Sequence, residues 1–199
     1  MKATLICLAA ALAATATPAR ATGEPGAAFP HAAQQDNPCY TWAAVAEKAY
    51  GMPKGLMTAI VTQESGGHAY ALNVDGKAFR YRTAAEAAYA IQDKARSAFE
   101  IDVGCGQLNI RWHGVKFKTL GALLDPHVNM SYAAWHLSVL YKQTGSWAKA
   151  AGQYHSFDSN RNRPYVCSLK RLVEKKDGDD ADLARFCNGG GPNMLSASR

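Results

Sequence analysis

Apolar side chains recur every three or four residues over much of this chain, the spacing that places them along one face of an α-helix. Between residues 54 and 64, for example, Leu56, Ile60 and Val61 share one face, and Gly66 follows as a stop signal. The pattern predicts helices over residues 38–50, 54–64, 83–98, 125–144, 147–154 and 163–175.

Residue types that favour helix ends flank most of these stretches. The candidate caps are Asn37 with Pro38, Thr83 with Glu86, Asp125 with Pro126, Gly145 and Ser146. Because caps and apolar spacing agree, we expect most of the chain to be helical.

Residues 71–82 follow a different period. Leu72 and Val74 precede Asp75-Gly76, and apolar residues alternate again after it, which predicts a β-hairpin. A short extended piece is predicted over 101–110. The expected fold class is therefore α+β and predominantly helical, with a small β-hairpin insert between the second and third helices.

The first 21 residues have the features of an export signal. Lys2 supplies a positive charge, an apolar run covers residues 5–16, and Ala19-Arg20-Ala21 has the small-x-small form of a cleavage site. A retained amphipathic or core helix is the alternative. The run is too short to span a membrane comfortably and no second run follows, so we expect cleavage near Ala21 and no transmembrane segment afterwards.

Composition divides the rest of the chain into three parts. Residues 22–36, rich in Ala, Gly, Pro and Gln, are expected to be a flexible lead-in. The domain itself is predicted to cover residues 37–176. Residues 177–199 are expected to form a C-terminal extension that is partly disordered, because a glycine-rich stretch follows Cys187.

Removal of the signal takes away one of the five cysteines and leaves Cys39, Cys105, Cys167 and Cys187. An even number in an exported protein predicts two disulfides, although buried thiols are the alternative. Three pairings are open and the sequence does not choose among them. We favour Cys39–Cys105 with Cys167–Cys187, because the last two lie in one C-terminal segment.

The formal net charge is +6, and loss of Lys2 and Arg20 with the signal removes two of these charges and leaves +4. This excess suits an anionic surface such as a cell envelope, or nucleic acid. The basic residues are scattered, with no dense block and no recognised nucleic-acid module. We therefore expect no nucleic-acid partner.

Glu64 is the first candidate for catalysis. It ends an apolar helix, where the negative end of the helix dipole disfavours ionisation, and partial burial beside Ile60 and Val61 would raise its pKa further. A carboxyl that stays protonated near neutral pH is what a general acid needs to protonate a glycosidic oxygen. Position alone is weak support, since an exposed polar residue before a glycine stop is common.

Four segments in order strengthen this hypothesis. They are Gln63-Glu64-Ser65-Gly66-Gly67, Asp102-Val103-Gly104-Cys105-Gly106-Gln107-Leu108-Asn109, Asp125-Pro126-His127-Val128-Asn129 and Ala151-Gly152-Gln153-Tyr154-His155-Ser156. Together they make residues 38–170 resemble the soluble lytic transglycosylase family, whose domain is lysozyme-like. The fourth segment matches loosely, because Ala151 stands one residue too far from Tyr154. Residues 72–76 and the Arg111-Trp112-His113-Gly114 run look like the subgroup of secretion, conjugation and related envelope proteins.

The resemblance implies a mechanism. Glu64 would be the sole acid/base, cleaving the bond between N-acetylmuramic acid and N-acetylglucosamine and leaving a 1,6-anhydro end without using water. Gln107 would hold substrate amide groups, and the hydroxyl of Tyr154 would lie near Glu64. Ser65 would bond nearby backbone or sugar, with helix termination as an equal alternative.

Two roles are open for each of several further residues. Asn109 is a substrate-binding candidate that is expected to secure the local turn, and His155, where Asn is common, would bind sugar or fill space. Most family members carry Leu-Met where this chain has Cys105-Gly106, so Gly106 would widen a subsite. Among the carboxylates that could serve a hydrolase, Asp102 would line the cleft or cap a turn.

Two further expectations complete the candidate site. Trp112 is the best candidate on the surface for stacking on sugar rings. The histidines lack metal-ligand spacing, so we expect neither metal nor cofactor.

The sequence therefore predicts a monomeric, periplasmic peptidoglycan lytic transglycosylase, with an envelope secretion or conjugation apparatus as a candidate partner. One alternative is a hydrolytic muramidase on the same fold. The other is a non-catalytic glycan-binding component of an envelope-spanning machine.

Overall fold

The computed structural model describes residues 37–176 and 178–189. The predicted signal and lead-in, residues 1–36, lie outside the described residues, as do residues 190–199 of the predicted C-terminal extension.

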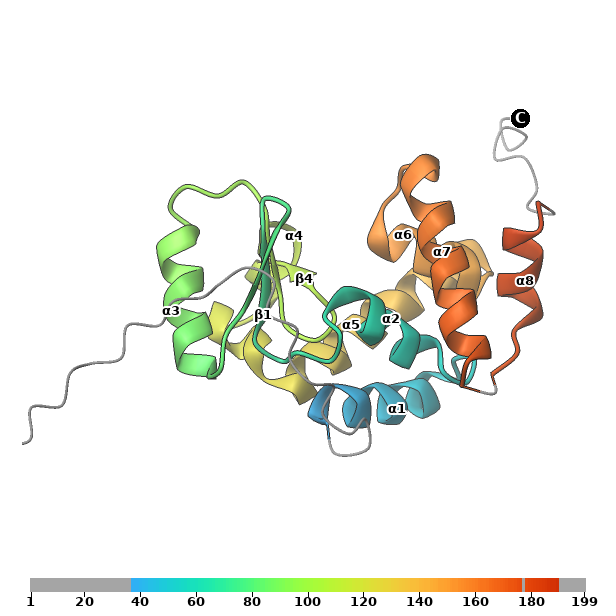
Figure 1. Cartoon of the computed structure of the whole chain (residues 1–199), viewed down its shortest axis with the longest axis horizontal. Helices are drawn as coiled ribbons and strands as arrows, with labels where there is room; N and C mark the ends of the chain where they lie inside the picture. Colours follow the sequence, from blue (N-terminus) through green and yellow to red (C-terminus); the bar gives the residue numbers. More distant parts are fainter. Residues whose placement is uncertain (1–36, 177, 190–199) are drawn as a thin grey trace, which may run out of the picture.

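The described chain forms two lobes (Figure 1). The helical elements are α1 (Pro38–Tyr50), α2 (Leu56–Glu64), α5 (Pro126–Thr144), α6 (Trp147–His155), α7 (Ser159–Glu174) and α8 (Ala181–Cys187). The sheet lobe contains β1 (Ala71–Val74), β2 (Lys77–Arg80), α3 (Ala84–Lys94), β3 (Ile101–Val103), β4 (Leu108–Asn109), α4 (Ile110–His113), η1 (Gly114–Lys116) and η2 (Leu120–Leu124). The predicted α+β, predominantly helical fold class is confirmed.

The prediction of α7 started too late. The predicted helix began at about residue 163, whereas the helix in the structure begins at Ser159 and contains Pro164, a residue that is rare inside helices. Asp158 caps it by accepting a hydrogen bond from the amide of Asn160 at 2.9 Å. The short elements α4, η1, η2 and α8 were not predicted, because pieces of three to seven residues carry little periodic signal.

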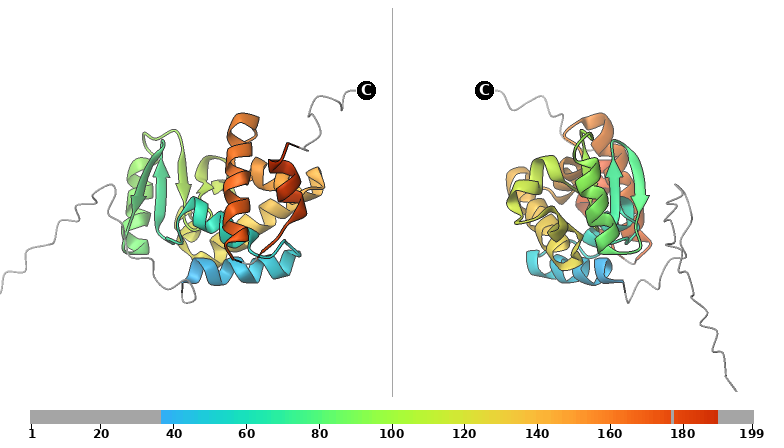
Figure 2. Two further views of the ribbon diagram at one scale, coloured as in Figure 1. Left: turned by 45° about the vertical axis from the view of Figure 1, so that its right-hand side comes forward. Right: turned by 90° about the vertical axis from the view of Figure 1, so that its left-hand side faces the viewer.

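The sheet has the strand order β2-β1-β3-β4, and every pairing is antiparallel. The predicted hairpin is present, with positive φ at both Asp75 and Gly76, as in a type I′ turn. The carboxylate of Asp75 also accepts hydrogen bonds from the amides of Phe99 and Glu100, so the turn holds the start of β3. Figure 2 shows α3 alongside this sheet, at the end of the molecule away from α8.

Helix α2 lies at the centre of the helical lobe, between α1 and α7 (Figure 1). Its apolar side chains Leu56, Met57, Ile60 and Val61 are fully buried. Its last residue, Glu64, therefore has a fixed position at the junction of the lobes. Among the described residues, none of the helices has the length and apolar character required to cross a membrane.

The start of α2 is anchored by a buried carboxylate. Glu47 of α1 accepts hydrogen bonds from the amides of Gly55 and Thr58, both at 3.0 Å. These amides belong to the first turn of α2, where helix N–H groups lack intrahelical partners. Glu47 thus caps the helix that carries Glu64.

Replacing Glu47 by alanine is expected to destabilise the protein by about 2–4 kcal/mol, because two amides would lose charge-assisted hydrogen bonds in a buried place. Urea denaturation with the disulfides intact measures this. Glu86→Ala is the matched control: it also removes a capping carboxylate, but an exposed one, so a loss below about 1 kcal/mol is expected. Equal losses for the two variants would contradict the role assigned to Glu47.

Two disulfides join the four cysteines, and the pairing favoured from the sequence is confirmed. Cys39–Cys105 connects α1 to the turn between β3 and β4, across 66 residues of sequence. Cys167–Cys187 connects α7 to α8. Part of the predicted C-terminal extension is therefore a helix attached covalently to the domain.

Candidate active site

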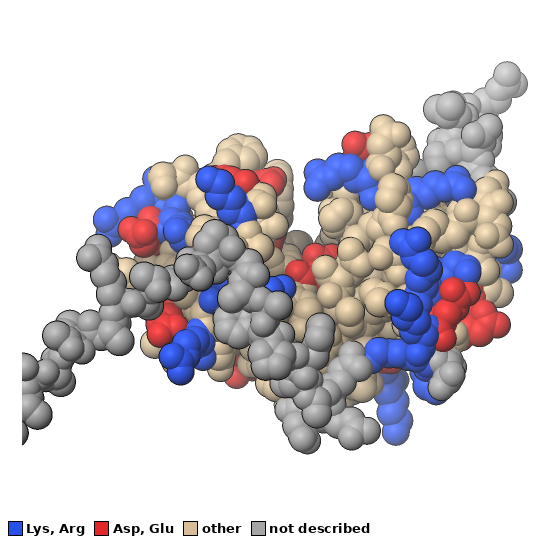
Figure 3. All heavy atoms as spheres, in the orientation of Figure 1, with Lys and Arg blue, Asp and Glu red and all other residues tan. Residues whose placement is uncertain are grey.

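A cleft of about 750 Å³ lies between the two lobes. Figure 3 shows the molecule hollowed there, with acidic side chains at the base. Glu64 of the helical lobe and Asp102 of the sheet lobe both line the cleft. A second hollow of about 290 Å³ shares Glu64 and His155 with it and continues over α7. Glu64 therefore lies where the two hollows meet.

Glu64 has two close neighbours from the helices that face α2. The hydroxyl of Tyr165, on α7, donates a hydrogen bond to its Oε1 at 2.5 Å. The Nδ1 atom of His155, the last residue of α6, lies 4.0 Å from the same oxygen. The His155 ring stacks on the Tyr165 ring with 4.3 Å between centroids, so the two neighbours hold each other in place.

Burial raises the pKa of Glu64 to about 7. Its hydrogen bond from Tyr165 opposes this shift, and the negative charge of Asp102 adds to it. The raised pKa predicted from the sequence is confirmed. The pKa of His155 is lowered, by burial and by the nearby charge of Arg161, so the imidazole is neutral near pH 7 and its contact with Glu64 is not an ion pair.

Asp102 is the second carboxylate of the cleft. It lies on β3 and accepts a hydrogen bond from Nδ2 of Asn109 at 2.8 Å. Burial raises its pKa to about 6; the bond from Asn109 lowers it and the charge of Glu100 raises it. Asp102 thus lines the cleft and loses its charge only in mildly acidic solution.

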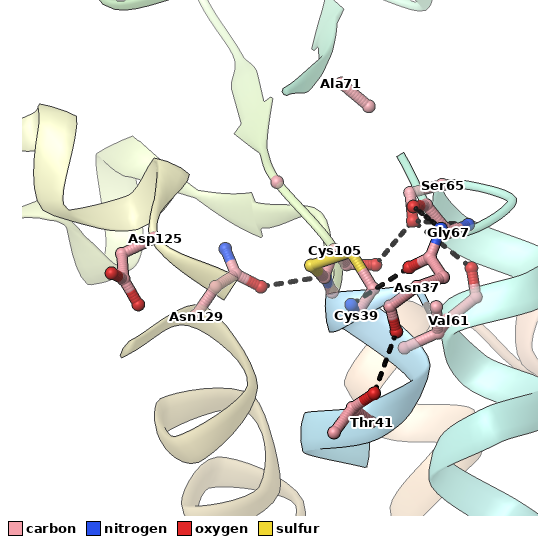
Figure 4. The surroundings of a disulfide bond; sticks show 12 residues. Asn37, Cys39, Thr41, Val61, Ser65, Gly67, Ala71, Cys105, Asp125 and Asn129 are labelled. Atoms are coloured by element: carbon pink, nitrogen blue, oxygen red, sulfur yellow. Dashed lines mark hydrogen bonds between the residues drawn. A yellow bond between two sulfur atoms is a disulfide. The ribbon is translucent and has the colours of Figure 1, made fainter. Parts of the chain in front are cut away.

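The turn between β3 and β4, residues 104–107, brings Gln107 to the lining of the cleft. Gly104 and Gln107 both have positive φ, which reverses the chain within four residues. Figure 4 shows how its first half is fixed: Cys105 is bound to Cys39, the carbonyl of Cys105 accepts from the hydroxyl of Ser65 at 2.8 Å, and the amide of Gly106 donates to Asn129.

Ser65 does not reach the cleft. Its side chain is 3% exposed, and its hydroxyl also accepts a hydrogen bond from the amide of Gly67. Of the roles predicted for Ser65, the bond to nearby backbone is present, and Ser65 is also the residue at which α2 ends. Because Ser65 directly follows Glu64, its bond to Cys105 connects the end of α2 to the 104–107 turn.

Gly106 does not widen a subsite, contrary to the sequence interpretation. A Cβ atom there would lie 2.9 Å from the Tyr154 hydroxyl and 3.1 Å from Cβ of Ala133. The Tyr154 hydroxyl instead donates to the Gly106 carbonyl at 2.6 Å. Glycine therefore allows the turn to pack against α5 and α6.

The remaining predicted residues line the cleft. Burial raises the pKa of the Tyr154 hydroxyl, and the nearby charge of Glu64 adds to this shift, although the direct bond to Glu64 comes from Tyr165. Gln107 uses its Nε2 to donate to the carbonyls of Gly104 and Ala71. Asn109 secures the local turn as expected, since its Oδ1 caps α4 while its Nδ2 binds Asp102.

Sequence reasoning missed Tyr165, the residue in direct contact with Glu64. The two lie 101 positions apart, and Tyr165 follows a proline in a helix whose start was placed wrongly. Its place on the apolar face of α7 was the signal available in the sequence, and such spacing does not distinguish a core residue from a site residue. In the part of the chain that the structure describes, no group of three or more His, Cys, Asp or Glu residues is placed to hold a metal ion.

A family model described as the transglycosylase SLT domain matches residues 42–165, more than half of the chain. The match begins in α1 and ends at Tyr165 in α7, so it includes both walls of the cleft. Neither a curated protein nor a solved structure matches this chain.

Proposed function

The chain belongs to the transglycosylase SLT domain family, whose lysozyme-like domain acts on peptidoglycan, and from this premise we propose that it is a lytic transglycosylase with Glu64 as its single acid/base. The bond cleaved would be the β-1,4 bond between N-acetylmuramic acid and N-acetylglucosamine. The observation that carries the proposal is a carboxyl in the cleft lining whose pKa, raised by burial to about 7, keeps the protonated form available near neutral pH.

In the first step the Glu64 proton moves to the glycosidic oxygen as the bond from that oxygen to C1 of the muramoyl residue breaks. The carbonyl oxygen of the 2-acetamido group of the substrate forms a bond to C1 in its place, which yields an oxazolinium ion. Glu64 is now a carboxylate, and the hydroxyl of Tyr165 stabilises its charge by donating a hydrogen bond.

In the second step the Glu64 carboxylate removes the proton of the muramoyl 6-hydroxyl. The freed oxygen attacks C1, the bond from C1 to the acetamido oxygen breaks, and a 1,6-anhydro ring forms. Glu64 regains its proton, so each cycle returns the enzyme to its starting state without water. Asp102 raises the pKa of Glu64 through its charge, which favours the protonated form at the start of the cycle.

The experiment that tests the proposal is mass spectrometry of the fragments that the protein releases from purified peptidoglycan. Muropeptides lighter by one water than hydrolysed ones are expected. Ordinary reducing ends would instead identify a hydrolytic muramidase, for which Asp102 is the observation in favour, since it supplies a second cleft carboxylate that could activate water. Absence of fragments from folded protein would favour a non-catalytic glycan-binding role.

Two disulfides and a peptidoglycan-acting domain indicate a protein that works outside the cytoplasm. We place it in the periplasm, exported by the N-terminal signal predicted from the sequence. A secretion or conjugation apparatus as partner remains a proposal that rests on the sequence of the hairpin insert and the Arg111-Trp112-His113-Gly114 run.

Activity is expected to fall as the pH rises through about 7, because the first step needs protonated Glu64. In Asp102→Asn the carboxylate that raises the pKa of Glu64 is gone, so this alkaline limb should move to lower pH. The measurement is kcat/KM for a soluble glycan substrate between pH 5 and pH 9. Asp125→Asn, which alters a helix cap outside the cleft lining, is the control. If the alkaline limb of Asp102→Asn lies at the same pH as in the parent, Asp102 does not raise the pKa of Glu64.

A further inference from the structure

Two large aromatic side chains at the cleft are left exposed by the fold. Trp112 is 66% exposed and Phe157 is 73% exposed, and both line the same cleft as Glu64. Other aromatic residues near the site, such as Tyr154 and Tyr165, pack against the core or lie within it. Because exposure of a large apolar side chain is unfavourable in water, a pair of them in one polar cleft indicates a ligand with apolar faces.

The two side chains come from opposite lobes. Trp112 lies on α4 of the sheet lobe, whereas Phe157 lies in the connection between α6 and α7 of the helical lobe. Figure 1 shows these two segments on either side of the space between the lobes. Each lobe therefore contributes one exposed aromatic side chain to the lining of the cleft that contains Glu64.

Local hydrogen bonds fix the backbone at both positions. Asn109 caps the helix of Trp112 by accepting a hydrogen bond from the amide of Arg111 at 3.0 Å. On the other wall, the amide of Asp158 donates to the hydroxyl of Ser156 at 3.1 Å, directly around Phe157. A backbone that is already fixed does not have to be ordered when a ligand binds, which lowers the entropic cost of binding at these two positions.

Sugar rings fit this arrangement. The glucosamine-type pyranose has one face of C–H groups and a rim of hydroxyl and amide groups, so it can stack on an aromatic ring while its rim bonds to polar groups. Gln63, Asn73 and Gln107 supply such polar groups along the same cleft. The cleft thus combines apolar contact on its walls with polar contact along its length.

We propose that Trp112 and Phe157 stack on N-acetylhexosamine rings of the bound glycan, one from each wall of the cleft, and set the affinity of the enzyme for it. This inference rests on the proposed function, since it assumes that the cleft binds a glycan strand. The two residues bind substrate and transition state alike, so they act on binding and on KM more than on kcat.

The test uses Glu64→Gln protein, which binds without turnover, and a peptide-free N-acetylglucosamine oligomer as the probe, with Kd measured by calorimetry. Trp112→Ala and Phe157→Ala are each expected to raise Kd by roughly tenfold. Trp112→Phe and Phe157→Tyr, which keep an aromatic ring, should retain most of the affinity. Tyr89→Ala is the matched control, because Tyr89 is 75% exposed on α3 and does not line the cleft.

Two outcomes would show that Trp112 and Phe157 do not stack on the sugar rings. If both alanine variants, folded by circular dichroism, bind the oligomer within twofold of the parent, the proposal is wrong. It is also wrong if they bind the oligomer normally and lose affinity only for peptide-bearing strands, since they would then contact the stem peptide. The chemistry is judged separately, on the protein with Glu64 intact: reducing ends instead of anhydro ends would overturn the proposed function and leave the sugar-stacking result standing.

Discussion

Glu64→Gln is expected to lower the rate of peptidoglycan cleavage by at least about 10³-fold, because one residue serves as acid in the first step and base in the second. Glutamine has nearly the same shape and can still accept the hydrogen bond from Tyr165, so the cleft should keep its structure. Loss of turbidity of peptidoglycan suspensions gives the rate, and mass spectrometry identifies any product.

The control for this variant is Glu174→Gln, which removes a carboxylate on the exposed face of α7, where it pairs with Lys170. It should cleave at the parental rate. Cleavage by Glu64→Gln within tenfold of the parent would show that another group supplies the proton.

The Glu64→Gln variant is also expected to change how the stability of the protein depends on pH. The pKa of Glu64 is raised from 4.5 to about 7 on folding, so its ionisation destabilises the native state. The destabilisation is absent below pH 4.5, grows between pH 4.5 and 7, and is complete above pH 7. Because the side chain is 16% exposed, the full value is at most about 3 kcal/mol.

Glu64→Gln removes this titration. The variant should therefore be more stable than the parent at pH 8, by an amount that shrinks toward pH 5. Urea denaturation at the two pH values measures the difference. A stability difference that does not change with pH would mean that Glu64 titrates normally in the folded protein.

Asn129→Ala is expected to destabilise the protein by about 3–5 kcal/mol. Asn129 is fully buried, and its Nδ2 donates to the carbonyls of Val103 and Leu123 at 2.9 and 2.8 Å. Its Oδ1 accepts from the amide of Gly106 at 2.8 Å. Alanine would leave all three backbone groups without hydrogen-bond partners in the protein interior. It would also remove the bond that fixes the turn containing Gln107.

Ser138→Ala provides the matched control. Ser138 is also buried on α5, but its hydroxyl bonds to the carbonyl of Trp135 in its own helix, so a loss below about 1 kcal/mol is expected. Urea denaturation with the disulfides intact compares the two variants. If Asn129→Ala loses no more stability than Ser138→Ala, the turn does not depend on the three bonds.

Much of the local structure could be predicted from the sequence. The caps expected at Asn37, Thr83, Asp125 and Ser146 are all present, each accepting a hydrogen bond from an amide two or three residues ahead. The hairpin with its turn at Asp75-Gly76 and the position of Glu64 at the end of α2 were also predicted correctly. These features depend on residues a few positions apart, whose spacing is visible in the sequence.

Contacts between distant elements could not be predicted in the same way. Which tyrosine bonds to Glu64 depends on how α6 and α7 pack against α2: Tyr154 matched the family pattern, yet Tyr165 makes the contact and Tyr154 bonds to Gly106. The absence of a side chain at Gly106 suggested open space, whereas packing against α5 and α6 fills that space.

The sequence by itself determined the longer helices, the hairpin and the even set of four cysteines, because each follows from composition or from spacing within one segment. It also indicated Glu64 as the catalytic candidate, through the order of four short segments along the chain. The tertiary structure decided which cysteines pair, that the buried Ser65 hydroxyl bonds to the carbonyl of Cys105, and that burial brings the pKa of Glu64 to about 7. The physical reason is that directional bonds and desolvation depend on distances in space, and the packing of α2 between α1 and α7 sets these distances.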